Sequence, residues 1–281
     1  MQAALFFAFT FSQLPDDNPW LPMRSRIMSA TGIGRGCFGD LVGILQTALL
    51  QGGFYTGTID GDFGGGTDRA VRSLQASMGK TQTGCADPLT WQRATGQEWP
   101  SLFERCLQVT ARLEGHGYQM VAGDFDGAGL TWGIIGFTLR HGEIQALVRE
   151  AMLRDPGLVR SAFGPVADDL IQRFIQNDWK ALKAWADSIS IGADKASVAQ
   201  PWRDGFLKLG QTPLMKQLQR DRARRQYFEP AVATAADLKL GGDLGTCLAF
   251  DIQVQNGGVK SADRKTYEAR MARATGPSLL D

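Results

Sequence analysis

The 281-residue sequence is long enough for two domains, and its composition is that of a globular protein with a sizeable apolar core. Hydrophobic residues make up 43% of it and charged residues 21%, which excludes wholesale disorder. Thirty basic and 29 acidic residues give a formal net charge of +1, so no overall field attracts the protein to nucleic acid or to anionic membranes. Any polymer that it binds must be recognised locally.

Metal-binding side chains are scarce in this sequence. A zinc site with two or three histidine ligands would need nearly the whole supply of histidine, which is His116 and His141. The four cysteines include no CxxC pair, which argues against a zinc ribbon or a thioredoxin-like redox centre. A zinc hydrolase is therefore disfavoured, and up to two disulfides are allowed but not required.

Residues 1–36 are expected to be an extension that precedes the folded domains. The apolar run at residues 1–12 is too short to cross a bilayer, for which a helix needs about 20 residues. It has no basic residue before it and no small-residue cleavage site after it, so we expect no cleaved signal peptide. Met28 opens a stretch typical of an ordinary amino terminus, so residues 1–27 are either an upstream extension or an error in the assigned start.

Three short helices around a glycine-rich loop are predicted next. Apolar residues repeat at helical spacing over residues 41–51 and again over residues 68–79, and a loop dense in Gly and Asp lies between them. Thr67 is expected to cap the second helix, and Asp87, followed by a proline, the third. Together these elements predict a small domain over residues 37–96, near the lower size limit for independent folding.

The loop of this domain carries a specific motif, GGFYTGTIDGDFGGGTDRAVRSLQ. It resembles the peptidoglycan-binding module that many cell-wall hydrolases carry, and the resemblance covers residues 40–95. We expect Asp60 to bond to amides within the turn and Phe63 to anchor the loop on the helices, since both residue types suit those roles. Cys37 and Cys85 flank the module, either as a disulfide pair or by chance spacing.

A larger, mostly helical domain is predicted over residues 97–281. A proline interrupts the chain at the end of the short connector 97–100. Helical patterns such as those at residues 142–155 and 167–189 then alternate with Gly and Pro breaks. Only residues 118–139 look like strand and turn, so we expect one small β-hairpin in this domain.

Glu114 is the first candidate catalytic residue. A helix capped by Ser101 is predicted to place Phe103, Leu107 and Glu114 on one core-facing stripe. Partial burial and the negative end of the helix both disfavour an ionised carboxylate, so the pKa of Glu114 is expected to be raised. A protonated carboxyl is what a glycosidase needs to protonate the leaving oxygen. The alternative is a helix-end glutamate that bends out into solvent.

A second carboxylate follows on the predicted hairpin, within GDFDGAGLTWGIIGF. An inverting glycosidase separates its acid and base by about 6.5–9.5 Å so that a water fits between base and sugar. A helix end that faces a hairpin can span this gap. Asp126 and Asp124 compete for the role of base, because residues two apart share one face of a strand.

The hairpin segment DGAGLTWGIIGF is similar to the DGRGYTGGIIGF-type segments of family 46 chitosanases, which belong to the lysozyme superfamily. Later segments, RDRARRQYFEPAV and AFDIQVQNGG, extend the resemblance in patches across residues 101–270. It implies Glu114 as general acid, Asp126 rather than Asp124 as general base, and Thr131 as a residue that helps to hold the attacking water. The Thr131 hydroxyl alternatively bonds within the hairpin.

Two departures from the chitosanase pattern weaken the implication that chitosan is the substrate. The interval between Glu114 and Asp126 is shorter, and Leu130 and Trp132 stand where those enzymes have a tyrosine and a glycine. Trp132 is the one tryptophan that we expect to stack on a sugar ring, although tryptophans in helical proteins are more often core residues.

Asp124 and His116 complete the predicted substrate-binding set with Trp132. His116 follows Glu114 closely in the sequence and is placed to line the cleft. Its alternative is a structural histidine in a turn, the more common role of a lone histidine.

The sequence thus predicts a mainly α protein, with a small three-helix peptidoglycan-binding domain before a lysozyme-like α+β domain. Its proposed activity resembles that of phage endolysins: binding to the bacterial cell wall and inverting hydrolysis of the glycan β-1,4 bond, as an N-acetylmuramidase. A chitosanase and a noncatalytic wall-binding protein are the alternatives.

No metal or organic cofactor is implied, because this chemistry uses only carboxylates and water. We expect a monomer whose partner is peptidoglycan, without nucleic acid or stable membrane insertion. It is expected to act in the periplasm or outside the cell, after synthesis in the cytoplasm without a cleaved signal peptide.

Overall fold

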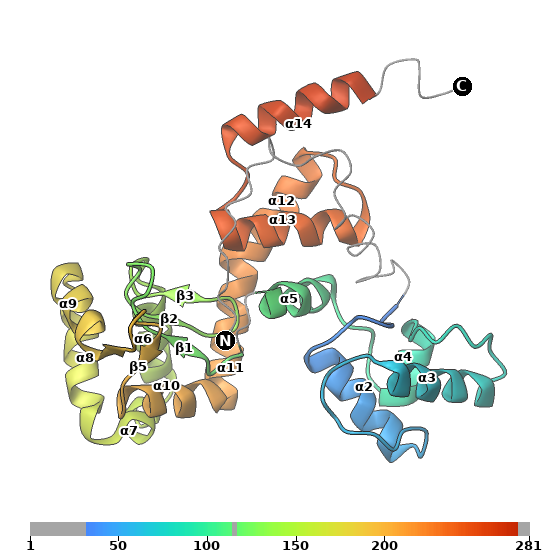
Figure 1. The fold of residues 1–281 in the computed structure, drawn as a ribbon, viewed down its shortest axis with the longest axis horizontal. Helices are drawn as coiled ribbons and strands as arrows, with labels where there is room; N and C mark the ends of the chain where they lie inside the picture. The colour runs from blue at the N-terminus through green and yellow to red at the C-terminus, as the bar shows by residue number, and fades with distance from the viewer. Residues whose placement is uncertain (1–31, 114–116, 275–281) are drawn as a thin grey trace. The chain divides into compact units, whose positions relative to one another are not determined.

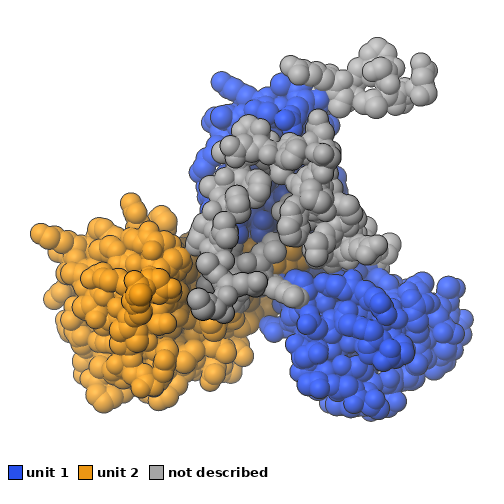
Figure 2. All heavy atoms as spheres, viewed as in Figure 1, with its two compact units in different colours: residues 1–108, 230–281 blue, residues 109–229 orange. Residues whose placement is uncertain are grey.

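The computed structural model describes residues 32–113 and 117–274, which form two compact units (Figure 2). The first unit joins the amino-terminal part, up to residue 108, to the carboxy-terminal part from residue 230. The second unit, residues 109–229, is inserted between these parts in the sequence. No described helix has both the length and the apolar character that a membrane span requires.

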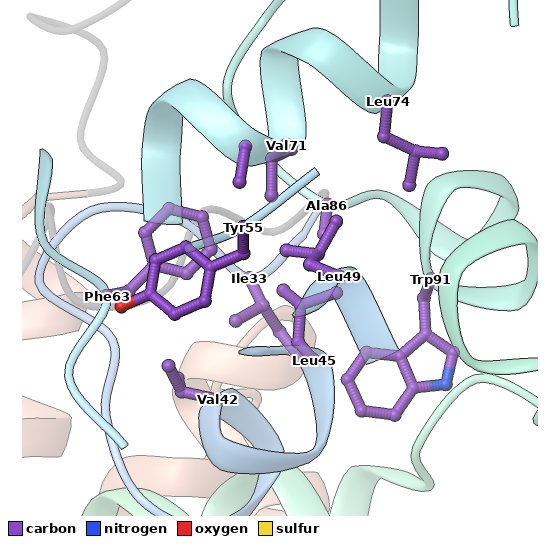
Figure 3. Packing of buried hydrophobic residues seen from close by; sticks show 11 residues of the cluster. Ile33, Val42, Leu45, Leu49, Tyr55, Phe63, Val71, Leu74, Ala86 and Trp91 are labelled. Carbon is purple, nitrogen blue, oxygen red and sulfur yellow. The ribbon is translucent and has the colours of Figure 1, made fainter. Parts of the chain in front are cut away.

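Three helices and the loop between the first two build the amino-terminal part of the first unit (Figure 1). Their bounds match the helices predicted from the apolar spacing, and side chains from all three pack into one core (Figure 3). Leu45 of the first helix, Leu74 of the second and Trp91 of the third are each at most 1% exposed. The helices are α2 (Asp40–Gln51), α3 (Gly65–Ser77) and α4 (Pro88–Thr95).

A fully buried amide, that of Gln46 on α2, holds the glycine-rich loop. Its Nε2 donates to Asp60 Oδ1 at 2.8 Å, and its Oε1 accepts from the Gly61 amide at 2.9 Å. Asp60 also accepts from the amide of Asp62 at 2.9 Å, and these hydrogen bonds, first that from Gln46, lower the pKa of Asp60. Phe63 is 3% exposed, so both loop-holding roles predicted from the motif are confirmed.

Helix caps in this unit were predicted with mixed success. Asp87 caps α4 as expected, with Oδ1 accepting from the Thr90 amide at 2.7 Å. The prediction for Thr67 was wrong, because α3 begins at Gly65 and takes Gly64 as its N-cap. Thr67 instead lies buried in the first turn of α3, where its hydroxyl accepts a hydrogen bond from Gln46 Nε2 at 3.1 Å.

Replacing Asp87 with alanine should destabilise α4 by about 0.5–2 kcal/mol, the usual cost of removing an N-cap acceptor. Serine at the same position keeps a cap oxygen but loses the ion pair with Lys80, and so separates the two contributions. Hydrogen exchange of the amides in residues 88–95, measured by mass spectrometry, reports the effect. Exchange as fast in the serine variant as in the alanine variant would contradict a capping role.

Four further helices complete the first unit or lead into it. The start of α5 is capped as predicted, with Ser101 Oγ accepting from the Glu104 amide at 3.3 Å. The Tyr267 hydroxyl donates to the Leu238 carbonyl at 2.9 Å and so ties the last helix to the segment before it. The helices are α5 (Leu102–Leu113), α12 (Glu229–Asp237), α13 (Gly242–Asn256) and α14 (Ser261–Ala274).

The second unit surrounds a three-stranded antiparallel sheet with helices. Its strands follow one another in the order β1 (Val121–Ala122), β2 (Thr131–Trp132) and β3 (Phe137–Thr138), so β2 is central. This small sheet and the helical surroundings confirm the predicted mainly α fold. The helical segments are α6 (Glu143–Arg154), α7 (Leu158–Phe163), the 3-10 turn η2 (Gly164–Val166), α8 (Ala167–Gln176), α9 (Trp179–Ile189), α10 (Trp202–Gln211), α11 (Pro213–Ala223) and the π-helical turn η3 (Arg224–Phe228).

Two features of the second unit differ from the sequence prediction. The single helical pattern at residues 167–189 is two helices, because Asn177 adopts the left-handed conformation (φ 52°) and Asp178 caps a new helix. A second hairpin, β4 (Ser190–Ile191) paired with β5 (Ser197–Val198), was not predicted at all. Strands of two residues are too short to produce a readable alternation of polar and apolar side chains.

Candidate active site

The described candidate site residues, Asp124, Asp126, Thr131 and Trp132, belong to the second unit and lie in β2 or in the loop that leads into it. Two further candidates, Glu114 and His116, lie outside the described residues. Helix α5, on which Glu114 was expected, ends at Leu113. The remaining four are described, and their surroundings separate them into two groups.

Asp126 lies in an exposed loop between β1 and β2. Its Oδ1 accepts a hydrogen bond from the Ala128 amide at 2.9 Å, which orients the carboxylate within the turn. Glycines with positive φ follow at positions 127 (83°) and 129 (82°), a backbone that other residues rarely adopt. The loop therefore presents a solvent-accessible carboxylate, and its backbone conformation at positions 127 and 129 favours glycine.

Asp124 is in a very different environment, although it lies only two residues from Asp126. Its side chain is 1% exposed and forms an ion pair with Lys183 of α9. Its other oxygen, Oδ1, accepts from the Gly129 amide at 3.0 Å, and its own amide donates to Ser190 Oγ at 2.9 Å. Both carboxylate oxygens thus hold the loop in place, and Asp124 is a structural residue rather than a sugar ligand in this structure.

The sequence predicted that the two aspartates share one face of a strand, but in the structure they do not. Strand β1 ends at Ala122, and the backbone bends through the residues that follow it. Burial of Asp124 and exposure of Asp126 are consequences of that bend. The arrangement leaves Asp126 as the carboxylate that is open to a water molecule.

Thr131 is the first residue of the central strand β2. It pairs with Ala122 of β1 and with Thr138 of β3, and it is 9% exposed. Its place in the middle of the sheet fixes its backbone on both sides, and the loop that bears Asp126 enters this strand directly.

Trp132, the next residue, is a core side chain. It is completely buried and packs against Phe206 of α10 with a ring-centroid distance of 5.2 Å. A buried indole has no free face to offer a sugar ring, so the expectation that Trp132 stacks on substrate does not fit this structure. The neighbouring Phe163 continues the cluster, edge-on to Phe206 at 5.0 Å.

A second buried carboxylate, Glu143, lies beside β3, at the start of α6. One of its oxygens accepts from the Thr138 amide at 3.0 Å, and the other accepts from the Tyr227 hydroxyl of the π-helical turn. Burial first, and then the charge and hydrogen bond of Glu143, raise the pKa of Tyr227. Neither residue was predicted from the sequence as part of a buried pair, because 84 residues separate them.

Tyr227→Phe should remove the hydroxyl while keeping the ring against Phe137, at a cost of about 1.5–3 kcal/mol for a hydrogen bond to a charged group. Tyr267→Phe is a matched control, because it loses a bond to a neutral carbonyl, and should cost less, about 0.5–1.5 kcal/mol. Chemical denaturation measures both differences. Equal costs for the two variants would argue against a charged partner for Tyr227.

The raised pKa of Tyr227 also predicts a pH dependence. An unfolded tyrosine ionises near pH 10, whereas folded Tyr227 stays protonated above that value. Its contribution to stability is therefore complete below about pH 10 and is lost as the pH rises further. Ultraviolet titration should show a tyrosine ionisation that occurs only with alkaline unfolding, and that step should vanish in Tyr227→Phe.

Comparison with known protein families identifies the family of this chain. A family model for glycosyl hydrolase family 46 matches residues 114–278, more than half of the chain. The chain belongs to glycosyl hydrolase family 46. The resemblance inferred from the hairpin segment is thereby confirmed, as is the expectation of a glycoside hydrolase. A second model, described as "Putative peptidoglycan binding domain", matches residues 38–93 of the same family 46 chain.

Curated relatives match a shorter stretch of this family 46 chain. Two spore cortex-lytic enzymes of Bacillus cereus are 45% identical to it over 60 residues. The match covers 21% of the chain and 23% of each relative, so it spans about a quarter of their length.

Proposed function

We propose that the protein is a modular peptidoglycan hydrolase, which binds the bacterial cell wall and cleaves its glycan strands. The observation that carries this proposal is the presence, in one chain, of a peptidoglycan binding domain model at residues 38–93 and a family 46 glycosyl hydrolase model at residues 114–278. Binding by the first domain raises the local concentration of polymer for the second. The cortex-lytic relatives are consistent with this substrate class.

The proposed reaction is inverting hydrolysis of a β-1,4 glycosidic bond, with N-acetylmuramidase specificity. Glu114 donates a proton to the leaving oxygen, and Asp126 removes a proton from a water that attacks the anomeric carbon from the opposite face. Thr131 helps to hold that water. The exposed, oriented carboxylate of Asp126 supports its role, and the burial of Asp124 and its ion pair with Lys183 favour Asp126 over Asp124.

The product ends identify the bond that is cut. Purified peptidoglycan digested with the full chain should release fragments with a reducing muramic acid end, as measured by mass spectrometry. A reducing glucosamine end, an anhydro end or a cut peptide would each replace the muramidase assignment by another activity. Proton NMR of the first product should show inversion at the anomeric carbon.

A chitosanase is the second candidate, and the family 46 match favours it, since the resemblance of the hairpin segment is to chitosanases. Chitosan is a polycation, whereas the chain has a nearly balanced charge of +1 and no acidic excess to attract it. Reducing ends released from chitosan and from peptidoglycan, measured side by side, separate the two. A higher kcat/KM on chitosan would overturn the preference for peptidoglycan.

A shortened chain tests the proposed roles of the binding domain and the hydrolase domain. Removing residues 1–96 should lower activity on whole walls more than activity on short soluble glycan fragments, because only the polymer profits from a separate binding domain. Circular dichroism of the shortened chain checks that its helices persist. Equal losses on both substrates would contradict the tethering role.

We place the site of action in the periplasm or outside the cell, where the wall is. An origin as a phage endolysin made in the cytoplasm is part of this proposal, and the protein is expected to act as a monomer. Light scattering of the purified protein tests the last point.

A further inference from the structure

Helix α5 packs against α13 through a ladder of matched side-chain contacts. Phe103 of α5 lies edge-on to Phe250 of α13, with ring centroids 6.4 Å apart. Arg105 of α5 forms an ion pair with Asp243, which lies nearer the start of α13. Later residues of α5 thus meet earlier residues of α13, so the two helices run antiparallel.

Cys106 and Cys247 occupy the next step of this ladder. Cys106 is three residues after Phe103, and Cys247 is three residues before Phe250, which puts both on the facing sides of their helices. They are 0% and 5% exposed, so their thiols are enclosed between the two helices. A hydrogen bond between the thiols, together with burial, raises the pKa of Cys106.

The two cysteines lie on either side of the second unit in the sequence. The second unit, residues 109–229, is inserted between the two helices in the sequence. Cys106 precedes the insertion and Cys247 follows it, so a covalent link between them closes the chain into a loop around the entire unit. The two cysteines are 141 positions apart in the sequence, so no local pattern indicates that they are partners.

We propose that Cys106 and Cys247 form a structural disulfide once the chain reaches an oxidising compartment. The pairing follows from the contacts of α5 and α13. Only the compartment rests on the proposed function, since a wall-acting enzyme works where disulfides persist.

The reaction is thiol–disulfide exchange with a disulfide oxidant, such as oxidised glutathione. One cysteine thiolate attacks the oxidant, which breaks its S–S bond and releases one thiolate. The second cysteine thiolate then attacks the mixed disulfide, forms the Cys106–Cys247 bond and releases the other. Two protein thiols lose two protons and two electrons, and the oxidant is reduced to two thiols.

Because the thiolate is the attacking species, the raised pKa of buried Cys106 makes oxidation slow once the chain has folded. The link should therefore form fastest while the chain is unfolded or transiently open, when the helices do not enclose the thiols. The disulfide changes the covalent connectivity of the chain: after one protease cut anywhere in the second unit, the two fragments stay covalently linked. A wall-degrading enzyme that meets extracellular proteases would keep its binding domain attached in this way.

The test uses the full chain with Cys37 and Cys85 both replaced by alanine. These two thiols also lie near each other, since Cys37 contributes to the raised pKa of Cys85, and their removal leaves only the proposed partners. The variant is refolded with a mixture of reduced and oxidised glutathione, denatured, and treated with a maleimide. We expect loss of both reactive thiols, a mass lower by two hydrogens, and a cross-linked tryptic peptide pair that contains both cysteines.

Limited proteolysis provides the second readout. A cut within the second unit should leave one band on a non-reducing gel and two after reduction. The same chain with Cys247→Ala should give two bands in both cases and one maleimide-reactive thiol. Full maleimide labelling of both cysteines after refolding, or disulfide-linked dimers instead of monomers, would overturn the proposal. None of these measurements depends on hydrolysis of peptidoglycan, so their failure is distinct from failure of the proposed function.

Discussion

Asp126→Asn should lower kcat on peptidoglycan by about 10²–10⁴-fold, the usual contribution of a general base. Asparagine keeps the shape of the side chain and an Oδ1 that accepts from the Ala128 amide, so the loop should keep its conformation. It cannot take a proton from water. Reducing-end release from purified walls measures the loss, and a wall pull-down of the same variant should show unchanged binding.

Matched variants make this result specific. Glu114→Gln should cause a loss of similar size, because both carboxyl groups act in one step. Asp124→Asn should instead act on stability, because it breaks the ion pair with Lys183 that holds the loop. Activity of Asp126→Asn close to that of the unaltered chain would disprove the assignment of the base. Unchanged lysis by both the Glu114 and Asp126 variants would favour the noncatalytic wall-binding alternative.

Trp132→Ala should lower the free energy of unfolding by about 3–5 kcal/mol, the range for removing a large buried aromatic side chain. The indole fills a space against Phe206 that neighbouring side chains cannot close fully. Urea denaturation followed by circular dichroism measures the change. At moderate temperature the loss of folded protein should lower activity in proportion, without a selective rise in KM.

Trp132→Phe is the matched control for this prediction. Phenylalanine keeps most of the aromatic contact and removes an indole N–H that has no hydrogen-bond partner among the described residues. We therefore expect a clearly smaller cost than for alanine. A sugar-stacking residue would give the opposite pattern, with unchanged stability and a raised KM on glycan fragments in both variants. That outcome would restore the role expected from the sequence.

Local patterns were sufficient to predict most of the fold. Apolar spacing gave the helices at residues 40–51 and 143–154 nearly to the residue, because each buries one continuous stripe. The break at Asn177 was missed because a left-handed residue leaves the apolar pattern on either side intact. The β4–β5 hairpin was missed because its short strands depend on tertiary contacts, among them the bond from the Gly123 amide to the Ala196 carbonyl at 3.0 Å.

The sequence motif predicted which residues belong to the candidate site, but not which of their side chains are buried or what they contact. The segment around Asp126 pointed to the family, which the comparisons confirm. Which aspartate is buried depends on Lys183 and Ser190, which lie about sixty residues further along the chain. Whether Trp132 faces a sugar or the core depends likewise on Phe206. Such distant partners leave no periodic trace near the motif, so the roles of these side chains had to come from the structure.

The neutral amide of Gln46 determines the pH range in which the glycine-rich loop keeps its conformation. An anchor without charge does not titrate, so among the loop contacts described above only the Asp60 carboxylate responds to acid. The pKa of Asp60 is lowered in the folded state, so its stabilising effect is present above about pH 4, the value of a free aspartate, and fades as the pH falls through the lower folded value. The anchorage should therefore persist unaltered through mildly acidic surroundings and give way only under strong acidification.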